Sequence, residues 1–199
     1  MASLSPAARL ASPVDTATHG EYVPGEIVTF PGRITDDGEF TPQAGRYHLY
    51  GGLFCPWWQR VAITRSLAGL DDVVTMSFVD GERDGRGWAF RAHHGPDPVN
   101  GFTLLRQAYE ATRAGFRGHV SVPALWDRAT ARLVSNDPRA IGVDLATRFR
   151  HLATPVLDTY PEPLRDKIEE LDAWLGPAVN RGTGPVSYTH LTLPTNREV

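Results

Sequence analysis

The sequence contains very little cysteine, lysine and methionine. Among its 199 residues there are one cysteine, Cys55, and two methionines, and 19 of the 20 basic residues are arginine, Lys167 being the exception. A single cysteine excludes an intramolecular disulfide and every four-cysteine zinc site. Any thiol chemistry must therefore use Cys55 alone.

Long apolar runs and an excess of positive charge are also missing. No segment approaches 18 consecutive apolar residues, and residues 1–20 lack the basic start and apolar stretch of a signal peptide. The formal net charge of −3 argues against a nucleic-acid-binding surface. We therefore expect a cytoplasmic protein with neither nucleic-acid nor membrane partners. The preference for arginine, with abundant Ala, Gly and Pro, points to a GC-rich bacterial genome.

The apolar pattern predicts strands and helices in the order β-α-β-α-β-β-α. Short β-branched or aromatic runs alternate with segments of helical spacing, and Pro56 and Pro138 suit first helical positions. This order is typical of a thioredoxin-like α/β domain. The predicted strands are 46–50, 73–79, 121–127 and 131–135, and the predicted helices are 56–70, 103–114 and 138–149.

Four segments of different character divide the chain. Residues 1–45 contain five prolines and little periodicity, which predicts an irregular N-terminal extension. We expect the thioredoxin-like domain over residues 46–152. The segment 153–184 is interpreted as a linker and the first helix of a truncated all-α domain. The segment Val186–Thr195 can be encoded by a transposon adapter used in sequencing-library preparation. Residues 185–199 are therefore interpreted as an artefactual tail.

Cys55-Pro56-Trp57 is the strongest local chemical signal. A cysteine directly before a first-turn proline lies where free backbone N–H groups and the positive end of the helix dipole stabilise a thiolate. A lone cysteine can equally be a small, inert core residue. Val122-Pro123 favours the reactive interpretation, because thioredoxin-like folds place a cis-proline loop beside such a cysteine, where the backbone offers its N–H and C=O to a thiol substrate.

The pair His93-His94 is the other candidate for chemistry. Adjacent histidines in a loop are expected to point apart, and the sequence shows no obvious third ligand. We therefore expect no metal site.

Several short motifs follow one another along the chain. They are Arg46-Tyr47-His48-Leu49-Tyr50, Cys55-Pro56-Trp57, Gly87-Trp88, Val122-Pro123-Ala124-Leu125-Trp126-Asp127, Ser135-Asn136-Asp137 and Tyr160-Pro161-Glu162. Together they resemble the S-glutathionyl-hydroquinone reductases, the xi class of glutathione transferases, over roughly residues 40–182. The resemblance implies a thioredoxin-like N-terminal domain, the start of an all-α glutathione-transferase C-terminal domain, and a homodimer in the full-length protein. It also implies glutathione or mycothiol as the thiol co-substrate.

The same resemblance assigns roles to individual residues. Cys55 matches the family nucleophile, and Trp57 and Trp88 match aromatic residues around the bound thiol. Val122, before Pro123, matches the backbone clamp on that thiol. The implied reaction removes the small thiol from an S-conjugated hydroquinone through a mixed disulfide on one cysteine.

The sequence departs from the family pattern near the expected γ-glutamyl end of the thiol. Asp137 stands where the family has a glutamate, and Pro138 stands where it has a serine whose hydroxyl and N–H contact that end. Proline supplies neither donor. Trp58 and Gln59 also replace a small residue and a histidine. Because mycothiol lacks a γ-glutamyl group, these departures and the GC-rich composition favour mycothiol over glutathione.

Two other functions stay open. In a conjugating glutathione S-transferase, a tyrosine or serine would activate the bound thiol, and in a non-catalytic thioredoxin-fold binding module Cys55 would be buried and inert. The reactivity of Cys55 toward iodoacetamide distinguishes these possibilities.

Overall fold

The structure is a computed structural model that describes residues 9–180 of the chain. These residues fall into two compact units that divide between Thr159 and Tyr160. The sequence places the corresponding boundary at 152/153. The predicted artefactual tail over 185–199 lies outside the described residues.

A four-stranded sheet forms the centre of the first unit. Its strands are β1 (Tyr47–Gly51), β2 (Thr75–Phe78), β3 (Ala124–Asp127) and β4 (Arg132–Ser135), in the spatial order β2-β1-β3-β4. β1 pairs parallel to β2 and antiparallel to β3, which pairs antiparallel to β4. This mixed topology confirms the predicted thioredoxin-like fold.

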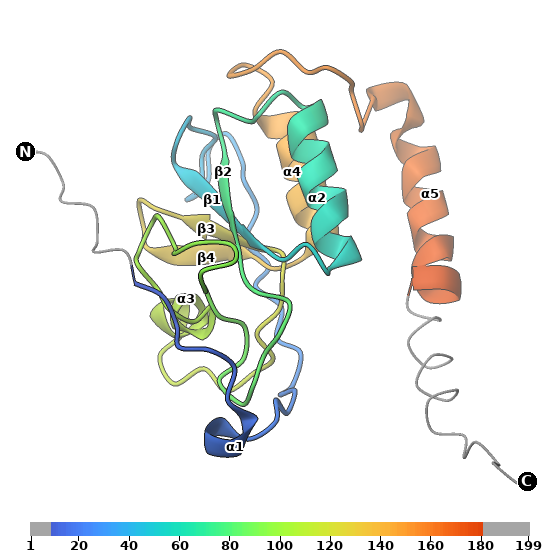
Figure 1. Ribbon diagram of the computed structural model, residues 1–199. Coiled ribbons are helices and arrows are strands. Elements are labelled where there is room, and N and C mark those ends of the chain that lie inside the picture. Colours follow the sequence, from blue (N-terminus) through green and yellow to red (C-terminus); the bar gives the residue numbers. More distant parts are fainter. Residues whose placement is uncertain (1–8, 181–199) are drawn as a thin grey trace, which may run out of the picture. The chain divides into compact units, whose positions relative to one another are not determined.

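Helices cover both faces of this sheet (Figure 1). α2 (Pro56–Leu67) and α4 (Pro138–Arg148) pack side by side on one face, and α3 (Arg106–Thr112) lies on the other. Each of α2 and α4 begins with the predicted proline, which fits because the first helical N–H has no partner within the helix. The order of helices and strands predicted over 46–149 is thus correct.

Side chains that alternate along the strands separate the core into two clusters. Residues facing α2 and α4 form one cluster, and their sequence neighbours facing α3 form the other, as the two-residue period of a strand requires. The first cluster includes Leu49, Leu125 and Val134, and the second includes Tyr50, Trp126 and Leu133.

Residues 9–45 are mostly irregular, as expected, apart from the short helix α1 (Thr16–His19). They nevertheless contribute to both clusters, since Phe30 and Ile34 are buried on opposite faces of the sheet. Asp144 on α4 holds this segment. Its buried carboxylate accepts hydrogen bonds from the Ile34 N–H at 2.9 Å and from the Arg33 guanidinium at 2.6 Å.

Replacing Asp144 by alanine is expected to lower the free energy of unfolding by about 1–3 kcal/mol, because the buried Ile34 N–H loses its acceptor. Urea denaturation of the whole chain measures the change. Asp36→Ala is the matched control, since Asp36 pairs with Arg148 on the surface and is 74% exposed. The control should change stability by less than about 0.5 kcal/mol. Equal losses in both variants would contradict the buried role of Asp144.

The second unit contains a 3-10 turn (Glu162–Leu164), α5 (Arg165–Leu175) and a π-helical turn (Gly176–Asn180). The Tyr160 hydroxyl donates to Glu169 at 2.5 Å, and the Arg165 guanidinium lies over the Tyr160 ring. Between residues 9 and 180, no helix has the length and apolar character needed to cross a membrane.

Candidate thiol site

Cys55 occupies the position directly before the first turn of α2. Its backbone is extended, with φ −99° and ψ 117°, and its side chain makes no capping hydrogen bond to the helix. The first-turn N–H groups of α2 are therefore not bonded to the Cys55 side chain, and the positive end of the helix dipole lies beside the half-buried thiol. The structure therefore confirms that Cys55 stands directly before the start of a helix, as the sequence predicts.

A cis-proline loop lies against the thiol. The Val122-Pro123 peptide bond is cis, and Cys55 Sγ donates to the Val122 carbonyl oxygen at 3.3 Å. The topology explains this contact. Because β3 is antiparallel to β1, the pairing of Ala124 with Tyr50 puts the start of β3 at the edge where β1 ends. The structure thus brings together Cys55, Val122 and Pro123, as the sequence predicted.

Trp88, expected near the thiol, stands in a stack of aromatic and cationic side chains. The Phe54 ring stacks on it with centroids 4.3 Å apart, and the Arg83 guanidinium lies 4.2 Å from its centroid. Arg83 also lies 4.0 Å from the Tyr22 ring centroid, and Tyr22 shares a hydrogen bond with His119. Burial, with a contribution from Arg83, lowers the pKa of His119, which favours its neutral form.

Sequence reasoning missed both Phe54 and Arg83. A signal for Phe54 was present in Gly52, because a Cβ at this position would lie 2.4 Å from the Phe54 ring. Arg83 carries no such signal, since its contacts join segments distant in the chain. Trp57, also predicted at the site, is 36% exposed on the first turn of α2.

The two residues after Trp57, which depart from the family pattern, support the fold around Cys55. Trp58 is 1% exposed and belongs to the core cluster beneath α2, where its indole packs directly against Gly51. The Gln59 side-chain amide donates to the Leu53 carbonyl oxygen at 3.1 Å and so closes the turn that carries Cys55. These departures from the family pattern therefore have structural roles.

Asp137 caps the N-terminus of α4. One carboxylate oxygen accepts from the backbone N–H groups of Arg139 and Ala140 at 2.9 and 3.3 Å. Its own N–H donates to Ser135 Oγ at 3.1 Å. Pro138 at the first helical position has no N–H to offer a ligand.

Asn136, which had no predicted role, ties the Asp137 turn to the cis-proline loop. Its side-chain amide accepts from the Phe30 N–H at 2.8 Å, and it donates to the Val28 carbonyl at 2.9 Å and to Ser121 Oγ at 3.5 Å. Ser121 directly precedes Val122. Asn136 therefore connects the two turns that the sequence assigns to thiol binding.

The histidine pair does not behave as expected. The prediction that the His93 and His94 rings point apart is wrong, because the rings stack with centroids 4.4 Å apart and planes 14° from parallel. The loop turns at this point, so the side chains do not alternate as they would on a strand. Asp80 supplies the third potential metal ligand that the sequence did not reveal.

No family profile matches the chain, but individual relatives do. The glutathionyl-hydroquinone reductase PcpF of Sphingobium chlorophenolicum is 34% identical over 148 residues, which cover 73% of this chain and 47% of the relative. The glutathionyl-hydroquinone reductase YqjG of Escherichia coli strain K12 is 35% identical over 156 residues, which cover 74% of this chain and 46% of the relative. The chain thus spans about half the length of these curated relatives.

Solved structures agree with the sequence comparisons. The glutathione S-transferase Xi from Phanerochaete chrysosporium aligns with a TM-score of 0.74 at 35% identity, covering 79% of this chain and 56% of that protein. The glutathione-bound structure of YqjG from Escherichia coli K-12 aligns with a TM-score of 0.73 at 33% identity, covering 82% of this chain and 56% of that protein.

Proposed function

Because the chain belongs to the xi-class glutathione transferases, we propose that the complete protein is a thiol-dependent reductase that removes a small thiol from S-conjugated hydroquinones. The observation that carries this proposal is the position of Cys55, at the start of α2 and 3.3 Å from the carbonyl of the residue before a cis-proline. Two relatives named as glutathionyl-hydroquinone reductases support it.

The proposed first step is attack of the Cys55 thiolate on the thioether sulfur of the conjugate. A sulfur–sulfur bond forms and the sulfur–carbon bond breaks, so the two sulfurs are oxidised while the ring carbon gains the electron pair and takes up a proton. The products are the free hydroquinone and a mixed disulfide on Cys55. A second small thiol then attacks this mixed disulfide, which releases the symmetrical disulfide and regenerates the thiolate.

The single cysteine supports this pathway over a dithiol mechanism. The chain has no second cysteine that could attack the mixed disulfide, so within this chain only an external thiol can resolve it. A cysteine at the helix start also argues against a conjugating transferase, in which a hydroxyl group activates the bound thiol. We propose that Trp57, Trp88, the Val122-Pro123 backbone and Asp137 hold the thiol, and that the complete protein is a cytoplasmic homodimer.

Pro138 bears on which thiol is used. A ligand that approaches the start of α4 meets no N–H at this position, and Asp137 already uses one carboxylate oxygen to cap the helix. A γ-glutamyl carboxylate would lack a hydrogen bond of about 1.5–3 kcal/mol there. Mycothiol has no such group, so we propose mycothiol as the preferred thiol over glutathione.

The thiol preference and the reductase function are tested together with the complete protein in single turnover, because the 199-residue chain, which lacks most of the all-α domain, is expected to be inactive. The complete protein is mixed with a mycothionyl-hydroquinone or its glutathionyl analogue, and released hydroquinone and the Cys55 adduct are followed by chromatography and intact mass. We expect release with both conjugates, about ten-fold faster with the mycothionyl one, which corresponds to about 1.4 kcal/mol. Faster release from the glutathionyl conjugate would reject mycothiol. Adduct formation without hydroquinone would reject the reductase function.

A further inference from the structure

We propose that Asp80, His93 and His94 form a binding site for a divalent transition metal, and that Zn²⁺ is the ion it fits best. One carboxylate oxygen and one nitrogen from each ring lie within 4.8 Å of one another. The three residues lie at the two ends of one loop, since Asp80 follows β2 and the histidines close the segment that carries Trp88.

The geometry needs only a small adjustment to bind the ion. Zinc bonds of about 2.0–2.2 Å in a tetrahedral arrangement separate neighbouring ligand atoms by roughly 3.4 Å. His94 Nε2 already lies 4.0 Å from Asp80 Oδ1. His93 is exposed, so its ring can turn and bring its nitrogen closer by the roughly 1.4 Å that separates 4.8 Å from the tetrahedral spacing.

An unsatisfied oxygen marks the centre of this cluster. Asp80 Oδ1 is buried and has no hydrogen-bond partner among the described residues. A buried acceptor without a partner costs about 1–3 kcal/mol, and more when it is charged. The oxygen that lacks a partner is also the one that faces His94 Nε2. A bound cation would satisfy it.

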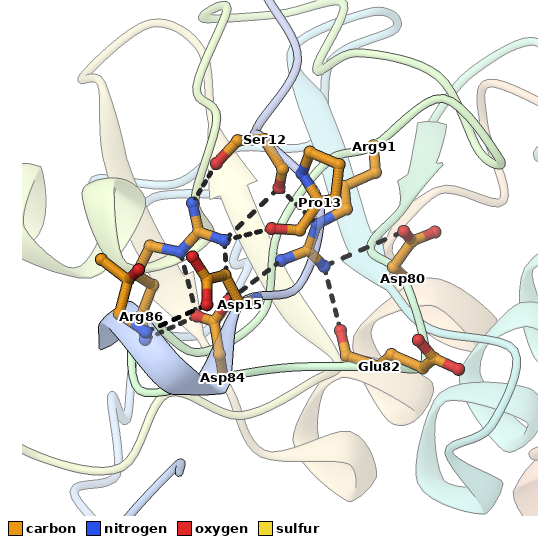
Figure 2. A network of polar contacts seen from close by, with 9 residues as sticks. Ser12, Pro13, Asp15, Asp80, Glu82, Asp84, Arg86 and Arg91 are labelled. Carbon is orange, nitrogen blue, oxygen red and sulfur yellow. Dashed lines mark hydrogen bonds and ion pairs between the residues drawn. The ribbon is translucent and has the colours of Figure 1, made fainter. Parts of the chain in front are cut away.

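Arg91 lies beside the cluster and contacts the other carboxylate oxygen (Figure 2). Its guanidinium donates to the backbone carbonyls of Ser12 and Glu82 at 2.9 and 3.0 Å, and one of its nitrogens lies 3.9 Å from Asp80 Oδ2. These bonds fix Arg91 on the Oδ2 side of Asp80 and leave Oδ1 for a metal. Its positive charge weakens cation binding, so we expect an affinity below that of three-ligand sites without a neighbouring arginine.

The donor set selects the class of metal. Two imidazoles and one carboxylate suit Zn²⁺ and similar first-row ions, and they leave a coordination position open for water or a ligand. Ca²⁺ and Mg²⁺ instead prefer sites made of oxygen ligands. A metal here would join the two ends of the loop over 80–94, and so hold the loop that carries Trp88 and Arg83.

The test is calorimetric titration of the 199-residue chain, freed of any histidine tag, with ZnCl₂. The titrations use a Cys55→Ser background so that the thiol cannot bind the ion. We expect one Zn²⁺ per chain and no binding of Mg²⁺ or Ca²⁺. Asp80→Asn and His94→Ala should each weaken Zn²⁺ binding by more than about ten-fold, because even groups that only support a ligand change affinity by about 10–100-fold.

The control is His151→Ala, which removes an exposed histidine elsewhere in the same unit and should leave binding unchanged. His93→Ala provides a variant that cannot disturb the core, since the His93 side chain is exposed. The proposal is overturned if the Cys55→Ser chain binds no Zn²⁺, or if His93→Ala in this background binds it as tightly as the control does.

Discussion

Replacing Cys55 by serine is expected to abolish both mixed-disulfide formation and hydroquinone release. A serine hydroxyl is a weak nucleophile without an adjacent base, whereas a cysteine thiol is intrinsically far more nucleophilic, and this thiol lies at the start of α2. Incubation with the disulfide of the small thiol, followed by intact mass measurement, detects the adduct. Cys55 is the only cysteine in the chain, so one adduct in the parent chain and none in Cys55→Ser assigns the site.

The unfolded chain offers a matched reference for the same thiol. Native chain at pH 7 should react with iodoacetamide faster than the chain unfolded in urea, although Cys55 is half-buried in the fold. Unfolding removes the helix N-terminus but keeps the sequence around the cysteine. If the native thiol reacts no faster than the unfolded one, the chain is better described as a non-catalytic binding module.

The parts of the site that depend on residues close together in the chain could be predicted from the sequence. Cys55-Pro56 marks a helix start because proline fits the first helical position, and Pro123 marks a strand start or an edge. Their contact could be predicted once the order of strands and helices indicated the topology. In the structure that contact is a direct hydrogen bond from the thiol to the Val122 carbonyl.

The buried face of α2 shows where periodicity fails. The helical spacing of the apolar residues predicts one core-facing stripe made of Trp57, Val61, Ile63, Leu67 and Leu70. Val61 and Leu70 are buried, but Trp57 and Ile63 are exposed. Trp58 and Arg65, which lie outside this pattern, are buried. Arg65 is tolerated in the core because its guanidinium donates to the Val74 carbonyl oxygen at 2.5 Å and pairs with the Asp71 carboxylate. A pattern of apolar residues cannot reveal a buried cation whose partners come from the following loop.

Contacts formed by long loops also could not be predicted from the sequence. Asp80 and His94 meet because their loop folds back on itself, and the Arg83 guanidinium lies between aromatic rings from two different segments. The spacing of residues along the chain does not indicate which distant side chains will be in contact. Local motifs therefore located Cys55 and its proline loop, while the groups that surround them required the fold.

His48 should make the stability of the protein strongly dependent on pH between about 4.5 and 6.5. Its ring is fully buried on β1 and bonds to Thr75 Oγ1 at 2.7 Å and Ser77 Oγ at 2.8 Å on β2. Burial, with smaller contributions from Arg128 and Arg65, lowers the pKa of His48 from 6.5 to about 3. As the pH falls below 6.5, the unfolded chain binds a proton that the native state does not, so folding loses up to roughly 1.4 kcal/mol per pH unit.

Urea denaturation at several pH values measures this slope. His48→Gln is expected to remove most of it, because glutamine does not titrate and its amide can still donate and accept hydrogen bonds. His151→Gln, which replaces an exposed histidine, should keep the slope.

The measurement is limited to pH values above 4.5 because a further loss of stability is expected at lower pH, where Asp127 gains a proton. Arg46 and nearby donors lower the pKa of this carboxylate despite its burial, so its protonation favours the unfolded chain. A slope that is the same in His48→Gln and in the parent chain would show that the buried imidazole is protonated in the native state, and that its bonds to Thr75 and Ser77 do not depend on a neutral ring.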